Sequence, residues 1–176
     1  MISRFKIFLR RFFIIDIKKC KKFSKKDKIY VNRLLRRCTI PYEIDLKKVT
    51  YRWASTEMLK GNKEAFSVVN NFKYPNTIFI QKIKDPRKKR GKKLPLELLK
   101  EAEKIYKKDL KMCIPILVHG LCHLGQYKKY TLIPYCFICG IPYFYNKILD
   151  REAYNYELEA AENLNLDKNL FGPPIS

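Results

Sequence analysis

The sequence predicts an α+β fold in which a small mixed β-sheet packs against helices. Short segments rich in β-branched and aromatic residues lie in the first half of the chain, and apolar residues recur at helical spacing in the second half. A length of 176 residues, with 47% apolar and 14% aromatic residues, suffices for one domain with a buried core. The same composition excludes a wholly disordered chain.

Positive charge dominates the composition and points to a polyanionic partner. The chain has 38 Lys or Arg against 17 Asp or Glu, a formal net charge of +21. Nucleic acid is the favoured partner, and an acidic membrane surface is the second. The six cysteines lack the spacing of a secreted disulfide framework, which favours a reducing compartment. The longest uncharged run, residues 130–146, is shorter than the roughly 20 residues that span a bilayer, so no membrane span is expected.

The first element is a basic N-terminal arm, residues 1–27. Residues 1–38 hold 14 Lys or Arg against two Asp, and the first fifteen resemble an organelle transit peptide. We expect a retained arm whose cations contact RNA phosphates and whose phenylalanines stack on bases. An amphipathic helix packed on protein is the alternative. The arm's expected RNA-binding residues are Arg4, Arg10, Arg11, Lys18, Lys19, Lys21 and Lys22.

The main domain is expected at residues 28–166. A helix over residues 28–37 is predicted because Ile29, Val31, Leu34 and Leu35 share roughly one side. Three short apolar segments with aromatic and β-branched residues are predicted as strands. These segments are residues 39–46, 65–70 and 76–80.

A basic insertion, residues 82–93, follows the last of these strands. It has eight cations and one acid, and Pro86 and Gly91 mark it as a loop. Most charge runs are merely solvated, but eight cations in twelve positions favour phosphate contact. The expected RNA-binding residues here are Arg87, Lys88, Lys89, Arg90, Lys92 and Lys93.

Three helices are predicted in the second half. One begins at Leu96, and a second covers residues 110–125, where Pro115 predicts a kink or a late start near Cys113. An aromatic insertion, residues 130–149, separates them from a final helix over residues 150–164. That helix has a formal charge of −4 and is expected to face away from RNA. Residues 167–176 form a C-terminal tail.

Two histidines on the second of these helices are candidate metal ligands. His119 and His123 are four residues apart, so they share one helix face and can bind one metal ion together. A catalytic metal site needs a third protein ligand, which the residues just after His123 do not obviously supply.

The order of these parts resembles the YbeY family of bacterial and organellar rRNA-maturation factors, which are regarded as metal-dependent single-strand endoribonucleases. The resemblance covers roughly residues 28–166 and implies a zincin-like metal-hydrolase architecture. It also implies that Arg52, in a segment similar to the family's Y-R segment, lines an RNA-binding pocket. The family motif is H-G-x-L-H-L-x-G-Y-D-H followed by a helix beginning E-A, and the matching residues are His119, Gly120, His123, Leu124, Tyr127, Glu152 and Ala153.

The chain departs from this motif at the metal site. The family's third ligand corresponds to Lys129, and its aspartate corresponds to Lys128. An ammonium group about 4 Å from a zinc ion would be repelled by roughly 8 kcal/mol at an effective dielectric constant near 20. Either the lysines turn away or the site holds no metal. Cys136 and Cys139 could complete a closed Cys₂His₂ zinc site, although cysteines in an apolar stretch are commonly small hydrophobic residues.

These observations predict a non-catalytic rRNA-binding protein with a degenerate site at His119, His123 and Lys129. It would be a structural component or assembly factor of a mitochondrial ribosome and would contact neighbouring ribosomal proteins. The alternative location is the ribosome of a plastid-type organelle. No cofactor is expected, and a bound zinc ion is the alternative. No homo-oligomer is expected. The alternative function is an active endoribonuclease that uses His119, His123 and an unrecognised third ligand. A protein-docking role without RNA is the third hypothesis.

Overall fold

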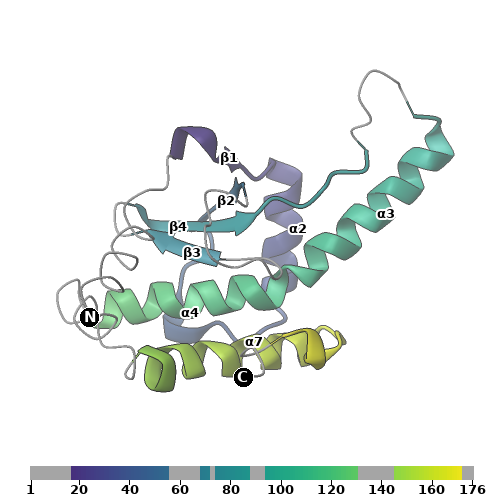
Figure 1. Cartoon of the computed structure of the whole chain (residues 1–176). Helices are drawn as coiled ribbons and strands as arrows, with labels where there is room; N and C mark the ends of the chain where they lie inside the picture. Colours follow the sequence, from purple (N-terminus) through teal and green to yellow (C-terminus); the bar gives the residue numbers. More distant parts are fainter. Residues whose placement is uncertain (1–16, 56–67, 72–73, 88–93, 131–144, 172–176) are drawn as a thin grey trace.

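A mixed β-sheet and a helical layer make up the part of the chain that the computed structural model describes, residues 17–55, 68–71, 74–87, 94–130 and 145–171 (Figure 1). This arrangement confirms the prediction of a small mixed sheet packed with helices. In spatial order, the strands are β1 (Lys21–Lys22), β2 (Thr50–Ala54), β4 (Tyr74–Gln81) and β3 (Val68–Asn71).

The strands β2 and β4 form the parallel centre of the sheet. Tyr51 lies opposite Ile78, and Trp53 lies opposite Ile80. The edge strands β1 and β3 pair antiparallel with β2 and β4 respectively. Ile78, Phe79 and Ile80 are all fully buried, although consecutive strand residues point to opposite faces. The second half of β4 is therefore covered on both faces, which explains its run of three apolar residues.

Helix α4 (Ile114–Tyr130) occupies the middle of the molecule. It lies between the sheet and α7 (Arg151–Asn163), and it packs against both (Figure 1). Leu117, Val118, Leu121 and Leu124 all belong to the main core. A helix covered on nearly every side has to be largely apolar all round, and α4 has no Asp, Glu, Lys or Arg before Lys128. This central position brings α4 next to both the sheet and the terminal helix.

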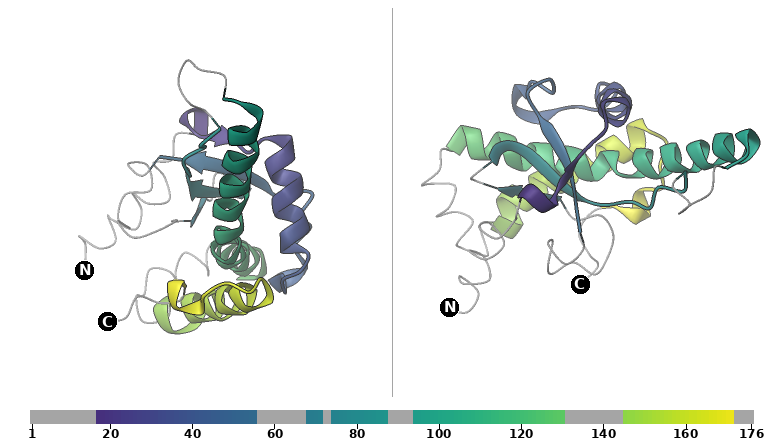
Figure 2. Two further views of the ribbon diagram at one scale, coloured as in Figure 1. Left: turned by 90° about the vertical axis from the view of Figure 1, so that its right-hand side faces the viewer. Right: turned by 90° about the horizontal axis from the view of Figure 1, so that it is seen from above.

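Helix α3 (Leu96–Met112) runs directly into α4 and projects beyond the rest of the described residues (Figure 1, Figure 2). Its buried residues are Ala102, Tyr106 and Leu110, spaced four apart on one face. Pro115 lies in the first turn of α4, where a missing backbone N–H has no helical partner to lose. The predicted late start near Cys113 is confirmed.

Helix α2 (Lys25–Leu35) begins earlier than the predicted residue 28. The side chain of Ser24 accepts a hydrogen bond from the Asp27 backbone N–H at 3.1 Å and so caps the first turn. Val31, Leu34 and Leu35 are buried as predicted, but Ile29 is 60% exposed. The boundary proposed between residues 27 and 28 therefore falls inside a helix.

The described part of the predicted arm packs into the domain. It comprises η1 (Ile17–Lys19), β1 and the turn into α2. Phe23 stacks on Trp53 with ring centroids 4.0 Å apart, and Cys20 is buried. Residues 17–27 are thus held by the sheet edge, whereas residues 1–16 lie outside the described part of the chain.

The strand predicted over residues 39–46 is wrong. This segment instead contains the short 3-10 helix η2 (Pro41–Glu43). Tyr42 and Glu43 adopt left-handed backbone angles, with φ of 60° and 48°. A Cβ added to Gly125 of α4 would lie 2.5 Å from Cβ and Cγ of Tyr42, so the glycine makes room for this turn. A tertiary contact has overridden the local β propensity.

The predicted terminal helix is confirmed as α7, which the π-helical turn η3 (Tyr145–Asp150) precedes. A short helix, η4 (Lys168–Leu170), follows it. Among the described residues, no helix combines the length and apolar character needed to cross a membrane.

Candidate metal centre

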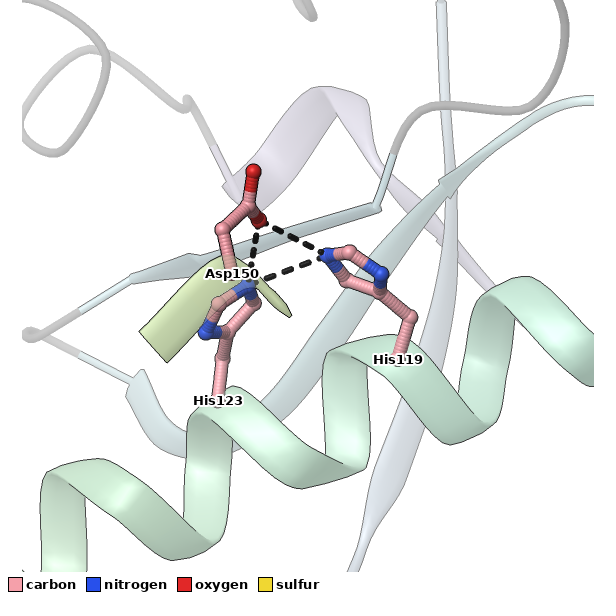
Figure 3. Close-up of side chains that lie close together, drawn as sticks. All are labelled: His119, His123 and Asp150. Atoms are coloured by element: carbon pink, nitrogen blue, oxygen red, sulfur yellow. Dashed lines mark hydrogen bonds and ion pairs between the residues drawn. The ribbon is translucent and has the colours of Figure 1, made fainter. Parts of the chain in front are cut away.

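Three side chains from α4 and η3 converge on one point. His119 and His123 project from successive turns of α4, and Asp150 faces them from the end of η3 (Figure 3). The two histidine Nε2 atoms are 3.0 Å apart, and the Asp150 Oδ1 atom is 3.3 Å from each. The predicted histidine pair is therefore joined by a carboxylate.

Hydrogen bonds on the far side of each imidazole fix its orientation. The His119 Nδ1 atom is 2.7 Å from the Glu157 Oε2 atom, and the His123 Nδ1 atom is 2.7 Å from the Gln126 Oε1 atom. Both oxygens accept hydrogen bonds, so each Nδ1 carries a proton and each Nε2 faces Asp150. Metal-binding histidines generally make this kind of contact through their second nitrogen.

The spacing and the donor types fit a transition-metal dication. The three converging atoms are 3.0 to 3.3 Å apart. Ligands bound tetrahedrally at about 2.0 to 2.1 Å lie roughly 3.3 Å from one another, so one ion can reach all three. Two imidazoles and a carboxylate suit zinc and similar metals, whereas magnesium and calcium prefer oxygen ligands alone. The residues present therefore fit a zinc-type ion.

The cluster also has the electrostatics of a cation site. Burial lowers the pKa of His119, but hydrogen bonds to Asp150 and Glu157 outweigh it and raise that pKa to about 9. Burial lowers the pKa of His123. Burial raises the pKa of Asp150, yet its bonds to the two histidines hold it at about 2. A proton on His119 Nε2 thus provides the hydrogen bond that links the three converging atoms. A bound metal ion would take the place of this proton.

The centre is partly open to solvent. The side chains of His119, His123 and Asp150 are 15%, 11% and 20% exposed. A structural zinc site uses four protein ligands, whereas a catalytic one uses three and leaves a position for water or substrate. Among the residues that the structure describes, three ligands converge, and three ligands with this exposure match the second pattern.

The two lysines at the positions where the resemblance implied an aspartate and a third ligand lie at the surface. Lys128 and Lys129 are both exposed. The Lys129 Nζ atom lies 5.5 Å from the ring centroids of Tyr42 and Tyr130. This position supports the alternative in which the lysines turn away from the histidines.

Asp150 was not among the ligands predicted from the sequence. The prediction sought a ligand six residues after His123, inside the motif, whereas Asp150 lies beyond the aromatic insertion. The available signal was the run of acids that opens the last helix of a very basic chain. All three acids of this run point toward α4. Asp150 and Glu157 contact His119, and Glu152 contacts Gln126. Glu152 also accepts a hydrogen bond from Tyr42.

The predicted RNA-binding residues are dispersed over the molecule. Arg52 on β2 donates from Nη1 to the carbonyl oxygens of Cys20 at 2.7 Å and Ile17 at 3.3 Å, and so holds η1 against the sheet. Arg87 pairs with Asp85 at 2.8 Å and lies over the Tyr106 ring. Exposed residues at the sheet edge are Lys18, Lys19, Lys21 and Lys22. Outside the described residues lie Arg4, Arg10, Arg11, Lys88, Lys89, Arg90, Lys92, Lys93, Cys136 and Cys139.

Comparisons of the chain with protein-family models, with curated proteins and with solved structures find no match.

Proposed function

We propose that this protein is a metal-dependent hydrolase that cleaves phosphodiester bonds of RNA. The observation that carries the proposal is the convergence of His119, His123 and Asp150, each held so that a potential ligand atom faces the same point. This arrangement supplies the third ligand that the alternative hypothesis from the sequence required. The resemblance of residues 119–127 to the YbeY motif supports the same activity.

Each residue of the centre has a definite task in this proposal. His119, His123 and Asp150 hold the metal, which when bound would polarise a phosphate oxygen and lower the pKa of a bound water. Glu157 and Gln126 keep the Nδ1 protons in place and so direct both Nε2 lone pairs inward. The Tyr154 ring packs against His119 in a T-shaped arrangement, with centroids 4.7 Å apart, and restricts rotation of that imidazole.

A basic edge on the described structure supports RNA as the substrate. Six exposed lysines lie within nine residues along η1, β1 and the start of α2. Their backbone is fixed by the pairing of β1 with β2 and by the contact of Phe23 with Trp53. Such a surface binds phosphates without reading sequence. The basic edge comprises Lys18, Lys19, Lys21, Lys22, Lys25 and Lys26.

Within this proposal the RNA is ribosomal, and the compartment is a mitochondrion, with a plastid-type organelle as the alternative. The resemblance to rRNA-maturation factors and the transit-like composition of the first residues support both points. The net charge of +21 fits a protein that works on ribosomal particles, beside ribosomal proteins.

The second candidate is a non-catalytic rRNA-binding protein, either a structural component or an assembly factor of such a ribosome. The observation that favours it is the replacement of the motif's aspartate and third histidine by Lys128 and Lys129. In that case the centre holds a metal for stability alone, or none.

Metal content and RNA cleavage, measured together, test the proposal. We expect the purified full-length chain to bind about one zinc ion, and Asp150→Ala to lose most of that metal and of the cleavage of end-labelled single-stranded RNA. Glu162→Ala is the matched control, because Glu162 is an exposed acid near the C-terminal end of α7, the helix that follows Asp150.

The outcomes separate the two candidates. Zinc binding together with cleavage that Asp150→Ala abolishes would support the hydrolase. Zinc binding without cleavage, in a chain that still binds RNA, would support the second candidate. A wild-type chain that binds no dication would contradict the metal centre.

A further inference from the structure

We propose that Tyr42, Glu152 and Gln126 form a hydrogen-bonded chain that fixes His123 as the tautomer protonated on Nδ1, leaving its Nε2 atom bare for a metal. These three are positioning residues, because they act through His123. The inference rests on the proposed metal centre for its purpose, but the tautomer itself is a property of the metal-free protein.

The orientation of the Gln126 amide is determined by its surroundings. Gln126 is fully buried, and its Nε2 atom donates to the Leu149 carbonyl oxygen at 2.8 Å and to Glu152 Oε2 at 3.0 Å. A carbonyl and a carboxylate only accept hydrogen bonds, so this end of the side chain must be the NH₂ group. The opposite end, Oε1, therefore faces His123.

This orientation selects one tautomer of the histidine. Gln126 Oε1 lies 2.7 Å from His123 Nδ1 and can only accept, so Nδ1 carries the proton. A neutral imidazole has a single ring proton, which leaves Nε2 with its lone pair directed at Asp150 and His119. Turning the amide over would place oxygen against the oxygens of Leu149 and Glu152.

Tyr42 anchors the far end of the chain. Its hydroxyl lies 2.7 Å from both carboxylate oxygens of Glu152 and donates to them. Burial and this hydrogen bond raise the pKa of Tyr42, so the hydroxyl remains a donor. Glu152 is thus held from one side by Tyr42 and from the other by Gln126.

The backbone around Tyr42 is built to allow this contact. Tyr42 and Glu43 both adopt left-handed angles, which non-glycine residues rarely do and which cluster at functional sites. Gly125, beside Gln126, leaves space for the Tyr42 side chain. The same amide that orients His123 also binds the carbonyl of Leu149, the residue before Asp150. Gln126 therefore helps to position two of the three ligands.

The tautomer can be measured directly in the metal-free protein. Long-range ¹H–¹⁵N NMR of histidine-labelled protein distinguishes a protonated Nδ1 from a protonated Nε2. We expect wild-type His123 to be protonated on Nδ1, and Gln126→Leu to shift toward protonation on Nε2. Zinc dissociation constants from chelator competition should rise about 10- to 100-fold in Gln126→Leu.

Two further variants keep the test independent of folding. Tyr42→Phe retains the ring and removes only the hydroxyl, so it should raise the zinc dissociation constant by a smaller factor, about 3- to 10-fold. Tyr156→Phe removes a hydroxyl from α7 outside the chain of contacts and should leave both the tautomer and the affinity unchanged. Circular dichroism would verify that each variant has the wild-type helix content.

The results separate this inference from the proposed function. A wild-type His123 protonated on Nε2 in the metal-free protein would overturn the inference, whether or not any variant folds. Unchanged zinc affinity in a folded Gln126→Leu protein would overturn it as well. Protonation on Nδ1 in a chain that binds no zinc would uphold the tautomer and contradict the metal centre alone.

Discussion

At the scale of single residues, the candidate site depends on polar side chains that are buried only because they are paired. Glu157 is 6% exposed and Gln126 is fully buried, and each has a histidine as a partner. A buried polar group without a partner is costly, so these contacts have to form whenever α4 and α7 pack together. Packing of the two helices and assembly of the site are therefore one event.

Glu157→Leu should weaken metal binding by about tenfold, because it removes the acceptor that orients His119. Glu157→Gln keeps an oxygen at that place and should weaken binding less. Zinc dissociation constants of the two variants provide the comparison. Equal affinity in wild type and Glu157→Leu would show that His119 needs no such partner.

Gly125→Ala should destabilise the fold by roughly 1 to 3 kcal/mol, because the added methyl group overlaps the Tyr42 side chain. Helix propensity alone would favour alanine by about 1 kcal/mol, so the sign of the effect is diagnostic. Urea denaturation gives the free energy of unfolding. Lys128→Ala, an exposed change in the same helix, is the control, and a stabilised Gly125→Ala protein would refute the contact.

At the scale of elements, two of the helices begin where local chemistry dictates. Ser24 caps α2, and Pro115 fits the first turn of α4, so both boundaries follow from a few neighbouring residues. The predicted helices were accordingly found close to their predicted places. The predicted strand over residues 39–46 failed because Tyr42 contacts α4, and no local pattern encodes that contact.

Ser24→Ala should lower the free energy of unfolding by about 1 kcal/mol, since the Asp27 backbone N–H loses its acceptor. Ser24→Asp supplies another acceptor and should have little effect. Thermal or urea denaturation of both variants would check this. A loss of stability in Ser24→Asp equal to that in Ser24→Ala would argue against capping.

At the scale of the whole molecule, charge is divided between two regions. The basic edge along η1, β1 and α2 presents lysines to solvent, whereas several acids of α7 and its preceding turn face α4 and the histidines. The sequence suggested only that the acidic helix would face away from RNA. Its acids instead include a candidate ligand, Asp150, and the partner of His119.

Replacing four lysines of the basic edge by alanine should weaken RNA binding in a salt-dependent way. For Lys18, Lys19, Lys21 and Lys22, the slope of log affinity against log salt should become shallower by about 3, at roughly 0.7 per phosphate contact. Fluorescence anisotropy with a labelled single strand would measure it. The matched control replaces four exposed lysines of α3 by alanine, namely Lys100, Lys104, Lys107 and Lys108. An equal change in the salt slope of this control would argue against a specific RNA-binding surface at the basic edge.

The sequence by itself determined the features that depend on neighbouring residues. Helical spacing placed His119 and His123 on one face, aromatic and β-branched residues marked β4, and composition set the net charge of +21. These features follow from backbone geometry and counting, so no tertiary contact was needed to predict them.

Only the tertiary structure decided how the candidate site is completed. Asp150 and Glu157 reach the histidines across an insertion whose length follows no motif. Tyr42, from a segment far earlier in the chain, is linked to His123 only through Glu152 and Gln126. Their contacts arise because α4 is buried between the sheet and α7, and burial forces each polar group to find a partner. Spacing along the chain could suggest two ligands, but packing supplied the third.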